Sequence, residues 1–166
     1  EDYTNRGSII TPLKDRIQSQ IFTHYPLNNA LGRAITQQEI KRFKNQENIV
    51  VPELMEVLLE QVAIEARKSE YVDVKSGVSA RLSITAYENV LSAVERRMLI
   101  NGLTHDSARI SDIYAAIPAI IGKIEMVYEG EQEGAVNVAK ILIDEAIKSV
   151  AVTLYPDLEN LGFKKS

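Results

Sequence analysis

Two arginines stand where a charged side chain could act on a phosphate group. Arg16 follows Asp15, between a short predicted helix that starts at Thr11-Pro12 and a predicted strand. Arg81 lies just before Ser83, the predicted cap of a long helix. A guanidinium is permanently charged and has a planar set of donors, so it suits the negative charge that builds on phosphoryl oxygens during nucleotide hydrolysis. Arginines at arbitrary positions more often form solvated surface pairs or bond to nearby carbonyls, and both alternatives stay open here.

Two short stretches imitate nucleotide-binding motifs without meeting their requirements. Gly122-Lys123 is similar to the end of a phosphate-binding loop, yet Ile117 stands where that loop needs Gly, and Ile124 where it needs Ser or Thr. Residues 141–145, Ile-Leu-Ile-Asp-Glu, imitate a Walker B strand, but their apolar positions follow a helical spacing that runs through 136–150. We therefore expect this chain alone to hydrolyse no ATP and to hold no bound cofactor.

The composition excludes several classes of function. There is no cysteine, and the two histidines, His24 and His105, are far apart, so zinc sites built from these residues have almost no material. The formal net charge of −4 disfavours a nucleic-acid binder, whose affinity depends on a basic surface. No apolar run approaches the about 20 residues that span a membrane. We expect a cytoplasmic protein with no metal site and no nucleic-acid or membrane partner.

From Asn28 onward, apolar residues recur at the spacing of a helix and predict a helical bundle. The predicted helices run from Asn28 or Asn29 to about Lys44, from Pro52 to Ala66, from Ser83 to Asn101-Gly102, from Ser111-Asp112 through Ile120, and from Val136 to Val150. Their predicted buried positions are Leu54, Leu58, Val62 and Ala66, then Ile84, Tyr87, Leu91, Val94 and Met98, then Val136, Ala139, Ile143, Ala146, Ile147 and Val150. Residues 69–82 are expected to form a loop, 129–134 a polar turn, and Arg96-Arg97 a solvated helix face.

Residues 1–26 follow a different pattern. The stretch from Ile17 to Tyr25 alternates roughly and is rich in residues that favour strands, which predicts one strand ended by Pro26. A lone strand is not stable in water, so its partners are expected upstream of Glu1 in a longer protein. The predicted fold class is mainly α: a helical bundle preceded by a short segment with one strand from the edge of a truncated α/β domain.

Residues 1–17, Glu-Asp-Tyr-Thr-Asn-Arg-Gly-Ser-Ile-Ile-Thr-Pro-Leu-Lys-Asp-Arg-Ile, resemble a stretch that follows the sensor-1 strand in AAA+ ATPases of the magnesium-chelatase and MoxR-like family. The Leu-x-Asp-Arg-[Phe/Ile] core of that stretch carries the family's arginine finger and corresponds here to residues 13–17. Residues 76–84, Ser-Gly-Val-Ser-Ala-Arg-Leu-Ser-Ile, look like the sensor-2 motif at the start of a lid helix. Residues 109–113 give a weaker third match.

The resemblance implies that residues 1–27 are the tail end of a AAA+ α/β core and that residues 28–166 are a helical lid domain. It implies that Arg16 is an arginine finger that acts in trans, and that Arg81 is the sensor-2 residue that contacts nucleotide in its own subunit. The parent protein would use ATP and Mg²⁺ in a homo-oligomeric ring, usually a hexamer, that remodels a partner or assists metal insertion. Proteins with a von Willebrand A domain are frequent partners in such systems.

A second interpretation is a free-standing helical interaction module without nucleotide chemistry, with a helix-turn-helix-like element in residues 83–122. Helical lids and DNA-binding bundles share the same apolar spacing, so the fold alone does not separate the two interpretations. A phosphate-binding loop and a Walker B motif encoded upstream of Glu1 would decide in favour of the ATPase.

Overall fold

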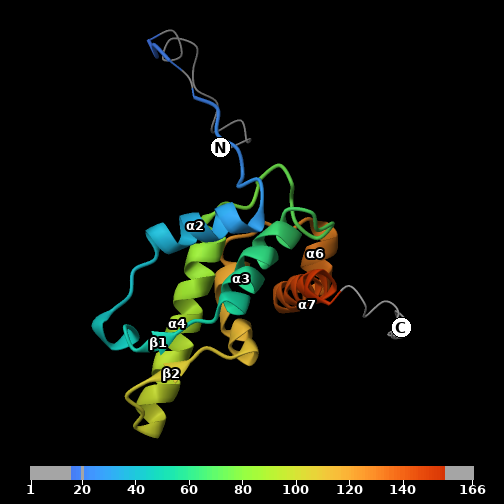
Figure 1. Ribbon diagram of the computed structural model, residues 1–166. Helices are drawn as coiled ribbons and strands as arrows, with labels where there is room; N and C mark the ends of the chain where they lie inside the picture. The colour runs from blue at the N-terminus through green and yellow to red at the C-terminus, as the bar shows by residue number, and fades with distance from the viewer. Residues whose placement is uncertain (1–15, 20, 156–166) are drawn as a thin grey trace.

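Helices make up most of the chain, as Figure 1 shows, and the mainly α prediction is confirmed. The computed structural model describes residues 16–19 and 21–155 of the 166-residue chain. The elements in chain order are α2 (Asn29–Glu39), the 3₁₀ turn η1 (Lys44–Gln46), β1 (Ile49–Val50), α3 (Glu53–Ala66), α4 (Arg81–Asn101), β2 (Asp106–Ser107), the 3₁₀ helix η2 (Ile110–Ala116), α5 (Ile117–Ile121), α6 (Tyr128–Glu133) and α7 (Ala135–Leu154).

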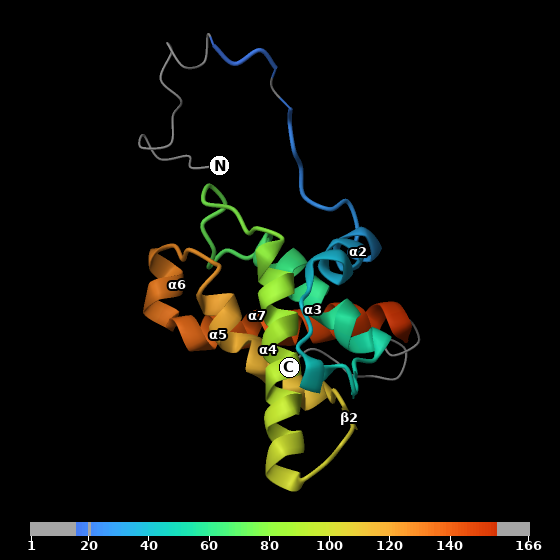
Figure 2. The ribbon, with the colours of Figure 1, turned by 90° about the vertical axis from the view of Figure 1, so that its left-hand side faces the viewer.

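Helix α4 runs through the middle of the bundle (Figure 2). Helices α2, α3 and α5 and the 3₁₀ helix η2 pack on it, and α3 also packs along α7. The buried side of α4 includes Tyr87, Leu91, Val94 and Met98, which recur every three or four residues and were predicted from that spacing. Ile84, predicted in the same stripe, is only partly buried. No helix in the described part of the chain is long and apolar enough to cross a bilayer.

Several predicted helix boundaries are confirmed by local chemistry. The side chain of Asn28 caps α2 by accepting a hydrogen bond from the backbone N–H of Leu31 at 2.9 Å. Pro52 precedes α3 directly. Gly102 ends α4 in the left-handed conformation, with φ of 64°, where a residue without Cβ is favoured. Helix α2 is shorter than predicted, because it ends at Glu39 rather than near Lys44.

Other predicted boundaries are wrong. Ser83 does not cap α4, because the helix already begins at Arg81 and Ser83 lies buried in its first turn. The predicted helix through Ile120 is divided into η2 and the short α5. The predicted polar turn at 129–134 contains most of α6. Two predicted core positions, Leu54 and Val136, are exposed.

The strand predicted over 17–25 is not present in the described residues of that stretch, 17–19 and 21–25, and their side chains are exposed. Alternating apolar residues form a strand only when another strand supplies hydrogen bonds. The described chain instead contains a parallel pair elsewhere, in which Ile49 of β1 lies opposite Asp106 of β2 and Val50 lies opposite Ser107.

Candidate functional site

Arg81 is the first residue of α4 and its side chain is exposed. Its backbone N–H donates to the Oγ of Ser79 at 3.1 Å, which fixes the chain just before the helix. Among the described residues, no hydrogen bond or ion pair involves its guanidinium. The start of a helix carries a partial positive charge, so this end of α4 and Arg81 together favour a negatively charged neighbour.

Arg16, the other predicted site residue, is exposed, and the blue segment that precedes α2 extends away from the helical bundle (Figure 1). Residues 1–15, which include Asp15 and most of the first motif, lie outside the described residues. No hydrogen bond or ion pair joins Arg16 to Arg81 in the described part of the chain. The role of Arg16 therefore stays a prediction, as does the domain boundary between 27 and 28.

The loop before Arg81 is held in place by polar contacts with the segment before α6. The Oγ of Ser76 donates to the carboxylates of Asp73, at 3.0 Å, and Glu125. The backbone N–H of Asp73 donates to the carbonyl of Glu125 at 2.8 Å, and Val72 forms an antiparallel bridge with Met126. These contacts order the residues that resemble the sensor-2 motif before the helix begins.

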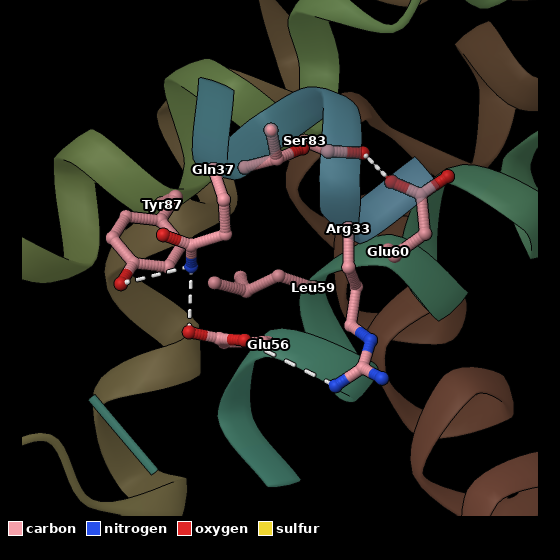
Figure 3. A pocket seen from close by; sticks show the side chains of 8 residues that line it. Arg33, Gln37, Glu56, Leu59, Glu60, Ser83 and Tyr87 are labelled. Atoms are coloured by element: carbon pink, nitrogen blue, oxygen red, sulfur yellow. Dashed lines mark hydrogen bonds and ion pairs between the residues drawn. The ribbon is translucent and has the colours of Figure 1, made fainter. Parts of the chain in front are cut away.

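A buried carboxylate holds the first turn of α4 (Figure 3). Glu60 of α3 is only 3% exposed, and its Oε2 accepts a hydrogen bond from the Oγ of Ser83 at 2.6 Å. The carboxylate fits against α2 because Gly32 has no side chain there. Burial raises the pKa of Glu60, while the hydrogen bond from Ser83 and the charge of Arg67 act in the opposite direction. Its other oxygen, Oε1, is buried without a hydrogen-bond donor among the described residues.

Next to this carboxylate, polar side chains of α2, α3 and α4 surround a small cavity (Figure 3). The Nε2 of Gln37 donates to Glu56 at 2.6 Å and lies 3.5 Å from the hydroxyl of Tyr87, which also accepts from Arg42 at 2.7 Å. Arg33 pairs with Glu56 across 3.9 Å. The enclosed space holds about one water molecule, which is far too small for a nucleotide. These residues position α4 and do not form a substrate pocket.

Sequence reasoning missed the role of Arg97. The prediction of a solvated face is right for Arg96 and wrong for Arg97. The Arg97 guanidinium donates to Asp106 at 2.7 Å, to Asp112 at 2.6 Å and to the carbonyl of Ser107 at 2.9 Å. The hydrogen bond from Arg97, and after it the one from the backbone N–H of Ser107, lower the pKa of Asp106. The cluster attaches β2 and η2 to the last turns of α4, and two aspartates shortly after an arginine were its only signal in the sequence.

Of the two motif imitations, residues 141–145 lie on a helix, as predicted. Asp144 and Glu145 lie exposed on α7, so residues 141–145 are not a Walker B strand. Gly122 and Lys123 follow the end of α5 and form a turn. Within the described residues, no three His, Asp or Glu side chains come together in a way that could hold a metal ion.

No family model, curated protein or solved structure matches the chain. The class that the described residues themselves define is a helical bundle, in which a 21-residue helix begins with an exposed arginine and is fixed from its first turn by a buried carboxylate.

Proposed function

We propose that this chain is the C-terminal part of a AAA+ ATPase of the magnesium-chelatase and MoxR-like type, and that Arg81 is its sensor-2 residue. The observation that carries the proposal is the placement of Arg81, an exposed guanidinium at the start of a long helix whose first turn is held by Ser83 and Glu60. A phosphate near that end of the helix would meet both the guanidinium and the positive end of the helix dipole. The order of the two motifs along the chain supports the same class.

In this proposal, Arg16 is an arginine finger that acts on the nucleotide of a neighbouring subunit. Its exposed side chain, in the segment that precedes α2, leaves it accessible to a neighbouring subunit. ATP and Mg²⁺ belong to the parent protein, whose phosphate-binding loop lies in another part of the polypeptide. The parent is proposed to form a cytoplasmic homo-oligomeric ring, a hexamer by analogy, that remodels a partner or assists metal insertion. A partner with a von Willebrand A domain belongs to the same analogy.

The trans role of Arg16 is tested by mixing two inactive forms of the full-length ATPase. One carries Arg16→Ala, and the other lacks the lysine of the phosphate-binding loop. A site with an intact loop on one subunit and an intact Arg16 on the next should regain ATP hydrolysis. Arginine fingers contribute about 10³–10⁵ in rate, so the regained activity should be unmistakable. Mixed rings that stay inactive, while mixed rings with wild type are active, would show that Arg16 does not act in trans.

The role of Arg81 is tested in the full-length ATPase by comparing Arg81→Ala with Arg96→Ala. Both side chains are exposed on α4, at its start and near its end respectively. Loss of a phosphate contact should lower ATP turnover in the Arg81 variant and leave the Arg96 variant active. Equal turnover in the wild type and the Arg81 variant would refute the sensor-2 assignment.

The second candidate function is a helical module that binds a protein partner without nucleotide chemistry. Leu99 and Ile100 near the end of α4 are each 71% exposed, and Leu103, just after the helix, is 45% exposed. Within 83–122, the helices that follow α4 are η2 and the five-residue α5, so no second helix there has the length of a DNA-recognition helix. A full-length protein that binds no ATP, and that loses a partner on Ile100→Lys, would favour this module over the ATPase.

A further inference from the structure

The segment that precedes the bundle is attached to it through Tyr25. The Tyr25 hydroxyl accepts a hydrogen bond from the backbone N–H of Val78 at 3.0 Å. The same hydroxyl oxygen lies 2.5 Å from the position of a Cβ on Gly77, so only glycine leaves room for it. Gly77 also has a φ of 71°, which glycine adopts without strain. The tyrosine and the loop before Arg81 are therefore shaped to fit each other.

Arg67, at the end of α3, connects this attachment to the interior. Its guanidinium lies 4.6 Å from the centre of the Tyr25 ring, which is the geometry of a cation–π contact. Its Nε–H donates to the carbonyl of Val78 at 3.2 Å, so Tyr25 and Arg67 bind the same residue of the loop. Its Nη1 lies 3.7 Å from Oε1 of the buried Glu60.

Glu60 completes the connection, because its second oxygen accepts the hydrogen bond from Ser83, in the same helical turn as Arg81. Contacts therefore run without interruption from Tyr25 through Arg67 and Glu60 to Ser83. Tyr25 belongs to the segment that carries Arg16, and Ser83 belongs to the turn that carries Arg81.

We propose that Tyr25 is a positioning residue, which attaches the bundle end of the segment carrying Arg16 to the loop that precedes Arg81. Arg16 lies nine positions before Tyr25 and the described residues between them are exposed, so the attachment at Tyr25 limits how far Arg16 can reach from this end of α4. The catalytic consequence rests on the proposed ATPase function, whereas the attachment itself is a property of this chain. In the ATPase, weakening the attachment should lower kcat more than it raises KM, because a finger acts mainly on the transition state.

The attachment is measured in this chain by the distance between two spin labels. Because the chain has no cysteine, Phe22→Cys and Lys123→Cys place single labels at exposed positions on the segment and on the bundle. Pulsed electron paramagnetic resonance should give a narrow distance distribution with Tyr25 present. Tyr25→Ala should lose the narrow peak, and Tyr25→Phe, which keeps the ring but not the oxygen, should broaden it less.

Tyr114→Ala is the matched control, because Tyr114 is 45% exposed and Tyr25 is 46% exposed. It should leave the narrow peak unchanged, and circular dichroism should show the same helix content in all variants. A narrow peak that survives Tyr25→Ala would overturn the attachment. So would a peak that is equally lost with Tyr114→Ala.

The catalytic consequence is measured in the full-length ATPase with the same substitutions. Tyr25→Ala should lower kcat with little change in KM for ATP, Tyr25→Phe should recover part of the loss, and Tyr114→Ala should behave as wild type. Normal turnover in Tyr25→Ala, when Arg16→Ala is inactive, would overturn the positioning role alone. If Arg16→Ala and Arg81→Ala also turn over normally, the proposed function fails, while the label distances still decide whether Tyr25 is an attachment.

Discussion

Replacing Gly32 by alanine should favour helix α2 through helix propensity but disfavour the fold through a clash with a neighbouring side chain. Gly32 lies inside α2, where alanine normally stabilises a helix by about 1 kcal/mol relative to glycine. An added Cβ, however, would stand 2.3 Å from both Cδ and Oε1 of Glu60, and 2.8 Å from its Cγ. These distances are far below van der Waals contact, and Glu60 is buried, so the carboxylate must move.

The expected loss of stability comes from the packing and the hydrogen bond that Glu60 would lose. Forcing extra volume into a packed site costs about 1–3 kcal/mol. Displacing the carboxylate also breaks its hydrogen bond with Ser83, and bonds to charged groups contribute about 1.5–3 kcal/mol. After the gain of about 1 kcal/mol in helix propensity, Gly32→Ala should lower the free energy of unfolding by about 1.5–5 kcal/mol. That is a large part of the about 5–15 kcal/mol that stabilises an ordinary domain.

Urea unfolding followed by circular dichroism measures this loss by linear extrapolation. The decisive comparison is the same substitution in a Glu60→Ala background. There the three nearest atoms to the new methyl group are gone, so Gly32→Ala should be neutral or stabilise by up to about 1 kcal/mol. If Gly32→Ala does not destabilise the chain that retains Glu60, or has the same effect in both backgrounds, the assigned contact is wrong.

Burial raises the pKa of Glu60 in the folded chain above its ordinary value of 4.5, which holds in the unfolded chain. The folded chain therefore loses stability as the pH rises from the unfolded-state pKa to the folded-state pKa, because the unfolded chain ionises first. Wild type should lose stability relative to Glu60→Gln over that interval, and a constant difference in unfolding free energy would contradict the assignment. Arg97→Lys should lower the melting temperature by about 2–8 °C, because one ammonium group cannot replace the planar contacts to two aspartates and a carbonyl, whereas Arg96→Lys should not change it. Asn28→Ala should cost about 1 kcal/mol in urea unfolding through loss of the cap on α2, and unchanged stability would show that the cap contributes nothing.

Helical spacing predicted much of the core because it is a local property of the chain. Tyr87 and Leu91 are buried where the period of α4 places them, and Ala139 and Ala146 likewise on α7. The left-handed Gly102 at the end of α4 could also be predicted, since its conformation depends on the residue itself.

Predictions that depended on distant partners failed. Ser83 has the chemistry of a helix cap, but its hydroxyl is used by Glu60, 23 residues earlier in the chain. The alternation over 17–25 favours a strand, yet Tyr25 directs its hydroxyl to the backbone of Val78 rather than into a sheet. Arg97 was predicted to be a solvated surface residue, but the chain after α4 folds back and places two aspartates within hydrogen-bond distance of it.

The candidate site was predictable only in part for the same reason. Arg81 at the start of a helix follows from its motif and from the apolar period that comes after it. The support beneath it, made by Gly32, Arg67 and Glu60, comes from α2 and α3. One signal was present in the sequence: Glu60 interrupts an otherwise apolar face of α3, and a charge at such a position needs partners.

The fixed ends of α4 limit how Arg81 could act in the proposed ATPase. Ser83 is bonded to Glu60 at the first turn, and Arg97 is bonded to two aspartates near the last turns, so both ends of the helix are held by the rest of the bundle. Packed, rigid elements that move together carry coupling between distant parts of a protein, such as the two ends of this helix. An approach of Arg81 to a phosphate would therefore require the bundle to move as one body, with only the exposed guanidinium adjusting on its own. The contact of Tyr25 with Arg67 and Val78 would carry the attached end of the segment along in the same movement. The distance between this segment and the bundle is therefore the quantity to measure first.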